Sequence, residues 1–107
     1  MDGSNIDMNA VMRQAKKMQG DLLRAQEKLA ATNFEATAGG GAVYVKINGK
    51  KEILEFKLSP EIVDPNDIET LQDAIVAAFT EVIKQSDEAA ASELGKLTGG
   101  MNTGGMF

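Results

Sequence analysis

The apolar residues change their periodicity twice along this chain, and the order of the periods restricts the fold more than any other feature. The first period alternates between three and four residues, which is typical of an amphipathic helix. Its members are Met8, Val11, Ala15, Met18, Leu22, Ala25 and Leu29. Asp7 or Asn5 is the expected N-cap. Gly20 lies inside the pattern and costs about 1 kcal/mol relative to Ala, or allows a slight bend, without ending the helix.

Between Thr32 and Pro60 the apolar residues alternate with polar ones, which predicts strands. The three runs are Phe34, Ala36 and Ala38; Val43, Val45 and Ile47; and Leu54, Phe56 and Leu58. Gly39-Gly40-Gly41 supplies a turn or bulge between the first two runs. Asn48-Gly49 predicts a two-residue hairpin in which both residues have positive φ. The pattern indicates a three-stranded antiparallel meander.

A second helical pattern follows the strands. Asp64-Pro65-Asn66-Asp67 predicts its start, with Asp64 as N-cap and Pro65 at the first helical position. The helix is expected to run to about Leu94 and to stop at Gly95. Its apolar residues form two neighbouring ridges, one of Ile68, Leu71, Ile75, Ala78 and Val82 and one of Val76, Phe79, Ile83 and Ala90.

These elements predict an α+β fold with the order helix, three-stranded antiparallel meander, long helix. Residues 1–97 form one domain, and residues 98–107 form a flexible tail rich in Gly and Met. The helices would reach about 36 to 42 Å and the strands only about 23 Å, so the apolar seams extend past the sheet. A homodimer would cover these seams and the open sheet edge, whereas in a monomer the two helices would have to cover each other.

The composition excludes several classes of function. The 107 residues contain no Cys, His or Trp, which excludes disulfides, zinc sites built on Cys or His, and Cys or His catalysis. The remaining polar residues form no nucleophile and base pair at motif spacing, so no enzyme and no cofactor are expected. No metal site is expected either, because the acidic cluster at the start of the second helix fits helix capping: Asp64, Asp67, Glu69 and Asp73. No apolar run has the roughly 20 residues that span a bilayer, so we expect an intracellular protein without membrane contact.

Charge is distributed unevenly along the chain. The net charge is -5. Up to Pro60, nine basic residues face seven acidic ones, whereas from Glu61 onward two basic residues face nine acidic ones. The first part is therefore mildly basic and the second strongly acidic, an asymmetry that can indicate a polyanion-binding face.

Five basic residues of the first helix share an arc of roughly 120°, opposite the apolar seam. This cationic face consists of Arg13, Lys16, Lys17, Arg24 and Lys28. It is either an ordinary solvated helix face or a surface that contacts nucleic-acid phosphates without reading bases. Lys50 and Lys51 at the hairpin tip are possible secondary DNA contacts.

Several segments together resemble the YbaB/EbfC family of bacterial nucleoid-associated proteins. They are MNAVMRQAKKMQ at 8–19, GGGAV at 39–43, NGK at 48–50, LQDAIVAAF at 71–79 and GKLTGG at 95–100. The resemblance implies a small cytoplasmic, tweezer-like homodimer with a central sheet and projecting helices. It also implies binding of duplex DNA, a change in DNA conformation, and roles in nucleoid organisation and gene expression.

Within this resemblance, Arg13, Lys16 and Lys17 stand in the matching N-terminal segment, whereas Arg24 and Lys28 come from the helical pattern alone. The family supplies no catalytic or base-reading motif. The alternative hypothesis is a dimeric adaptor for replication or repair proteins, which would use the acidic second helix and the tail with Met101 and Met106.

Overall fold

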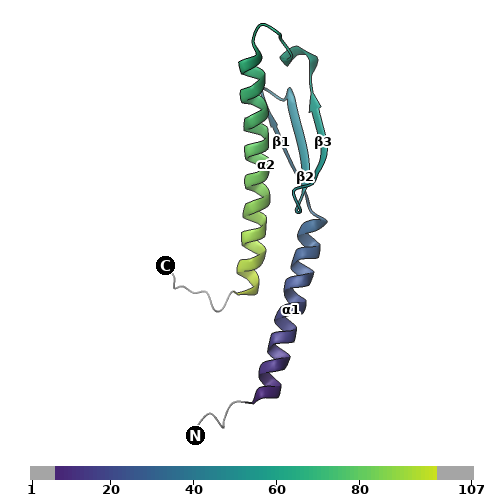
Figure 1. The fold of residues 1–107 in the computed structure, drawn as a ribbon, viewed down its shortest axis with the longest axis vertical. Coiled ribbons are helices and arrows are strands. Elements are labelled where there is room, and N and C mark those ends of the chain that lie inside the picture. The colour runs from purple at the N-terminus through teal and green to yellow at the C-terminus, as the bar shows by residue number, and fades with distance from the viewer. Residues whose placement is uncertain (1–6, 99–107) are drawn as a thin grey trace, which may run out of the picture.

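The computed structural model describes residues 7–98, which form an elongated molecule with extents of 77 × 28 × 15 Å. Figure 1 shows how its helices lie relative to its antiparallel sheet. In chain order the elements are α1 (Met8–Ala30), β1 (Asn33–Ala38), β2 (Val43–Asn48), β3 (Ile53–Leu58), a 3-10 turn (Pro60–Ile62) and α2 (Ile68–Leu97). The predicted α+β class and element order are confirmed.

Helix α1 begins where the sequence predicts. The Asp7 carboxylate caps it by accepting hydrogen bonds from the backbone N–H groups of Asn9 (3.0 Å) and Ala10 (3.3 Å). Asn5, the other N-cap candidate, lies outside the described residues. The helix continues through Gly20 and ends at Ala30, where the Thr32 hydroxyl donates to the Lys28 carbonyl at 2.7 Å.

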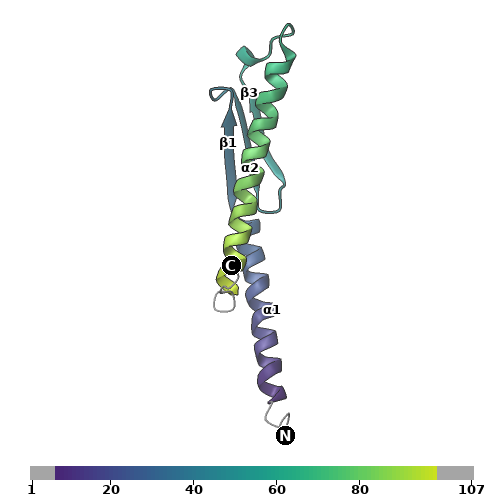
Figure 2. The same cartoon turned by 90° about the vertical axis from the view of Figure 1, so that its left-hand side faces the viewer.

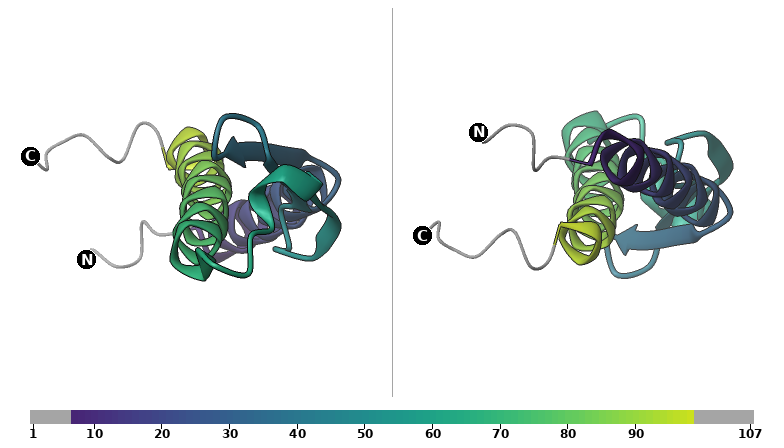
Figure 3. Two further views of the ribbon diagram at one scale, coloured as in Figure 1. Left: turned by 90° about the horizontal axis from the view of Figure 1, so that it is seen from above. Right: turned by 90° about the horizontal axis from the view of Figure 1, so that it is seen from below.

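The sheet has the strand order β1-β2-β3, and both pairs are antiparallel. Ala36 lies opposite Val45, and Ala38 lies opposite Val43, so the predicted inward alternation of β1 and β2 is confirmed. In β3 a register shift after Lys46 places Ile53, instead of the predicted Leu54, opposite Ile47. Helix α2 packs on this face of β1 and β2 (Figure 3). The resulting core is small and consists of Ala36, Val43, Val45, Ile47, Ala74, Ala78 and Val82.

The turn between β1 and β2 is made by glycines with positive φ, as the triple glycine suggests. Gly39, Gly40 and Gly41 have φ of 63°, 70° and 94°. At Gly39 a Cβ would also lie 2.8 Å from the Cδ1 atom of Ile62, so that side chain would have to shift.

The connection between β2 and β3 differs from the predicted two-residue hairpin. The loop is longer, and the residue with positive φ is Lys51, at 62°, instead of Gly49. The Asn48 side chain organises the loop by accepting from the N–H groups of Lys50 (2.9 Å) and Glu52 (3.1 Å). Gly49 serves a different purpose, because a Cβ at this position would overlap the Leu29 carbonyl at the end of α1.

The start of α2 also differs from the prediction. The N-cap is Asp67, whose carboxylate accepts from the Thr70 N–H (3.3 Å) and hydroxyl (2.6 Å). Asp64 instead forms a turn, in which its carboxylate accepts from the Asn66 N–H at 2.9 Å. Both aspartates accept a backbone N–H group in a manner typical of caps and turns, and the prediction selected the first one.

The C-terminal end of α2 lies beyond the predicted stop. The helix runs through Gly95 to Leu97 because nothing surrounding Gly95 demands a left-handed conformation. Its buried stripe also differs from the first predicted ridge, since it repeats every four residues: Ala74, Ala78, Val82 and Ser86. Ile68, Val76 and Ile83 are exposed. The predicted tail begins at Thr98 and otherwise lies outside the described residues.

Both helices extend beyond the sheet. Figure 2 shows α2 passing the end of the strands and running beside the C-terminal half of α1, while the N-terminal half of α1 projects further. No residue of α1 is fully buried, and Met8, Val11 and Met12 are 62%, 47% and 54% exposed. Within residues 7–98 the apolar seam of α1 is therefore covered only where α2 accompanies it.

Candidate nucleic-acid interface

The cationic face predicted from the sequence lies on α1 and is open to solvent. All five of its basic residues are exposed, and the side chains of Lys17, Arg24 and Lys28 keep 71%, 69% and 62% of their accessible surface. The apolar positions on the other side of the same turns are half-buried from Met18 to Leu29. Burial of the seam thus presents the cations outward, as the helical periodicity predicts.

The structure divides this face into two parts by its ion pairs. Arg13 and Lys16, in the N-terminal half, form no ion pair with any residue between 7 and 98. In the next two turns Asp21 pairs with Lys17 at 3.0 Å and with Arg24. The Lys17 ammonium, followed by the Arg24 guanidinium, holds the pKa of the Asp21 carboxyl below its ordinary value. Asp21 is therefore a negative charge at neutral pH within the cationic face.

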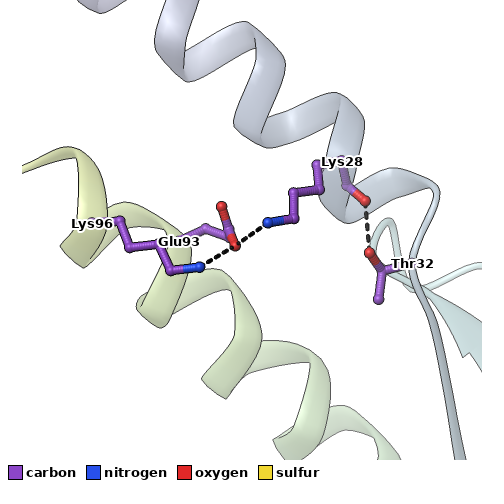
Figure 4. A network of polar contacts seen from close by, with 4 residues as sticks. All are labelled: Lys28, Thr32, Glu93 and Lys96. Carbon is purple, nitrogen blue, oxygen red and sulfur yellow. Dashed lines mark hydrogen bonds and ion pairs between the residues drawn. The ribbon is translucent and has the colours of Figure 1, made fainter.

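The last basic residue of the face is held by α2. The Lys28 ammonium lies 2.9 Å from the Glu93 carboxylate, which also accepts from Lys96 at 3.2 Å (Figure 4). Asp21, Arg24, Ala25, Lys28, Glu93 and Leu97 line a shallow groove of about 220 Å³ between the helices. Sequence reasoning missed Glu93 and Lys96. Their spacing of three residues indicates a contact within α2, but nothing in the sequence places Lys28 beside them.

The hairpin lysines are positioned differently from each other. The β2–β3 loop lies against the end of α1, where Gly49 approaches Leu29. Lys50 is exposed, whereas the Lys51 ammonium pairs with Asp87 of α2 at 2.9 Å. Of the two possible secondary contacts, Lys51 thus has an ion-pair partner within the chain.

The outer face of the sheet carries alternating charges and one tyrosine. The register places Lys46 between Glu35 and Glu55, and Lys57 lies 5.5 Å from the centre of the Tyr44 ring. Partial burial, with Glu35 and Glu55 nearby, raises the pKa of the Tyr44 hydroxyl. This hydroxyl therefore remains protonated at neutral pH and is a poor nucleophile.

Two features are absent from residues 7–98. Neither of the two helices there has the length and apolar composition needed to cross a membrane. The same residues contain no group of three or more acidic side chains arranged to hold a metal ion.

Comparison with known proteins identifies the family. The sequence model of the YbaB/EbfC DNA-binding family matches residues 3–101. The chain belongs to this family. A nucleoid-associated protein of Clostridium novyi is 50% identical over 105 residues, which are 98% of this chain and 92% of that protein. A nucleoid-associated protein of Pelotomaculum thermopropionicum is 46% identical over 107 residues, which are 100% of both chains.

A solved structure shares the YbaB/EbfC fold described above. The crystal structure of an uncharacterized protein from Helicobacter pylori matches with a TM-score of 0.72. The match covers 81% of this chain and 91% of that chain at 22% identity. The family resemblance drawn from the sequence is confirmed, and with it the assignment to a nucleoid-associated DNA-binding family.

Proposed function

We propose that this protein binds duplex DNA through the cationic face of α1, with little base readout, and works without catalysis. The observation that carries the proposal is the N-terminal half of α1, which projects beyond the sheet and presents Arg13 and Lys16 without internal ion pairs among the described residues. Cations one turn apart can contact successive phosphates and release counterions. Membership of a DNA-binding family supports the same conclusion.

The proposal includes a homodimer, and the uncovered part of the sheet supports it. Phe56 and Leu58 of β3 lie opposite Val45 and Val43, so they share the inner face, yet they remain 43% and 37% exposed. Helix α2 covers mainly β1 and β2, although Phe79 reaches Phe56 with ring centres 5.6 Å apart. A second copy seated on this apolar surface would bury it and present two cationic faces to one duplex.

The proposed cellular role follows the relatives that are named nucleoid-associated proteins. Two helices that contact the phosphates of one duplex can change its conformation without contacting the bases. We therefore assign the protein to the nucleoid in the cytoplasm, with roles in nucleoid organisation and gene expression.

A titration of unrelated duplexes across salt concentrations tests DNA binding. Lys16→Glu is expected to weaken binding about tenfold and to reduce the salt dependence. Lys84→Glu is the matched control, because Lys84 is also exposed on a helix and makes the same change in net charge but lies on the acidic α2. Equal binding by both variants would refute the proposed surface, and a wild type that retards no duplex but captures a protein partner would favour the adaptor.

A solution mass measurement tests the dimer. Phe56→Asp is expected to shift the wild-type dimer to the monomer, because a carboxylate would lie in the apolar surface. Thr37→Asp introduces the same group at an exposed position of β1 and should leave the mass unchanged. A monomeric wild type, or a folded Phe56→Asp dimer, would contradict the proposed interface; circular dichroism establishes that each variant is folded.

A further inference from the structure

Glu93 is the one acidic residue of α2 that reaches the cationic face of α1. Its carboxylate oxygen Oε2 lies 2.9 Å from the Lys28 ammonium of α1 and 3.2 Å from the Lys96 ammonium of its own helix. Figure 4 shows both lysines converging on it from different helices. One carboxylate thus forms ion pairs with two ammonium groups where α1 and α2 lie side by side.

The enclosure of this carboxylate differs from that of its partners. The Glu93 side chain is 17% exposed, whereas Lys28 and Lys96 are 62% and 64% exposed. The Lys28 ammonium, followed by that of Lys96, holds the pKa of Glu93 below its ordinary value, so the group is ionised at neutral pH. Glu93 is therefore a fixed negative charge, and the lysines are flexible groups that can leave it.

A DNA phosphate and the Glu93 carboxylate compete for the same hydrogen-bond donors on Lys28. A lysine that already has a carboxylate partner gains less from a phosphate, since the new contact replaces an old one. When such a lysine contacts a phosphate, DNA releases a counterion but the freed carboxylate attracts a cation from solution, so the net salt dependence of binding is lower. Arg13 and Lys16 have no such competitor among residues 7–98.

We propose that Glu93 is an intramolecular counterion that competes with DNA for Lys28 and thereby weakens phosphate contact at the C-terminal end of the cationic face. The inference rests on the proposed DNA-binding function and adds to it a limit on affinity that originates in α2. It explains how the acidic α2 affects the cationic face of α1 through one ion pair.

The test is a double-mutant cycle on DNA affinity at several salt concentrations. Glu93→Gln keeps the shape of the side chain and is expected to raise affinity about threefold at low salt, with a steeper salt dependence. Glu88→Gln is the control, because it makes the same change in net charge at an exposed position of α2. It should raise affinity much less.

The second arm of the cycle removes Lys28. Lys28→Gln is expected to reduce affinity only slightly in the wild type and about threefold in the Glu93→Gln background. The inference would be overturned if Lys28→Gln lowered affinity equally in both backgrounds, or if Glu93→Gln and Glu88→Gln raised it equally. In either case DNA binding by the wild type would leave the proposed function intact. Loss of all salt-dependent binding in every folded protein, the wild type included, would overturn both.

Discussion

The two halves of α1 share one sequence pattern but have different surroundings. In the C-terminal half, the apolar seam is half-buried beside α2, and the basic residues pair with Asp21 or Glu93. In the N-terminal half, Val11 is 47% exposed, and Arg13 and Lys16 have no ion pair among residues 7–98. The comparison teaches that one half anchors the helix, whereas the other is free to meet a partner on both of its faces.

The largest expected effect concerns the contact between the β2–β3 loop and the C-terminal end of α1. Gly49→Ala places a Cβ against the Leu29 carbonyl, so the β2–β3 loop has to move away from the end of α1. We expect a loss of about 3 kcal/mol in the free energy of unfolding, measured by urea denaturation. Gly95→Ala is the control, because outside its own turns of helix no described atom lies within 4 Å of its Cβ position and Ala favours a helix by up to about 1 kcal/mol. A Gly49→Ala protein as stable as the wild type would show that the loop does not anchor α1.

A smaller effect separates the two halves of the apolar seam. Leu22→Ala is expected to cost about 1 to 2 kcal/mol because Leu22 is half-buried, whereas Val11→Ala should cost less than about 0.5 kcal/mol within a single chain. Leu23→Ala, at a position 56% exposed, controls for the change in the helix itself. Thermal unfolding at several protein concentrations provides the measurement. Equal costs at Leu22 and Val11 would contradict the division, and a concentration-dependent cost at Val11 would show that a second copy covers it.

Adjacent lysines provide a comparison with a smaller effect on DNA binding. Lys16→Gln removes a cation that has no described ion-pair partner, whereas Lys17→Gln removes one paired with Asp21 at 3.0 Å. We expect Lys16→Gln to lower the DNA affinity about threefold relative to the wild type at salt concentrations between about 50 and 200 mM. The slope of log affinity against log salt concentration should fall in magnitude by about 0.9. Lys17→Gln should change both quantities less. Fluorescence anisotropy with a labelled duplex measures both. A larger effect of Lys17→Gln would reverse the assignment of the free cations.

The smallest effect is a pH dependence at the contact between the helices. Because Lys28 and Lys96 lower the pKa of Glu93 from its ordinary value of 4.5, this contact stabilises the fold above that pH and is lost as the pH falls through the lowered value. NMR titration of the Glu93 carboxyl should give a midpoint below 4.5, and Lys28→Met should raise it. A midpoint unchanged by Lys28→Met would mean that α2 does not hold the cationic face in solution.

Much of the fold follows from periodicity in the sequence. The step of three and four residues predicts α1, with Asp7 as one of two candidate caps, and the alternation predicts three strands with the inward faces of β1 and β2. The wrong predictions of element boundaries share a cause. Local signals such as Asn48-Gly49, Asp64-Pro65 and Gly95 each permit more than one backbone conformation. Surrounding residues select among these conformations. Gly49 is needed because it lies close to the Leu29 carbonyl, whereas no neighbouring side chain interrupts α2 at Gly95, and the helix continues to Leu97.

The sequence by itself determined which residues of α1 form the cationic face, because the angular position of a residue on a helix depends only on its number. It also separated the basic part of the chain from the acidic part. Only the tertiary structure decided which cations of the face and of the β2–β3 loop have an ion-pair partner on α2, since Lys28 of the face meets Glu93 and Lys51 of the loop meets Asp87. Such pairs form only where α2 runs beside α1 and the hairpin. The packing of α2 on the sheet sets its position along both.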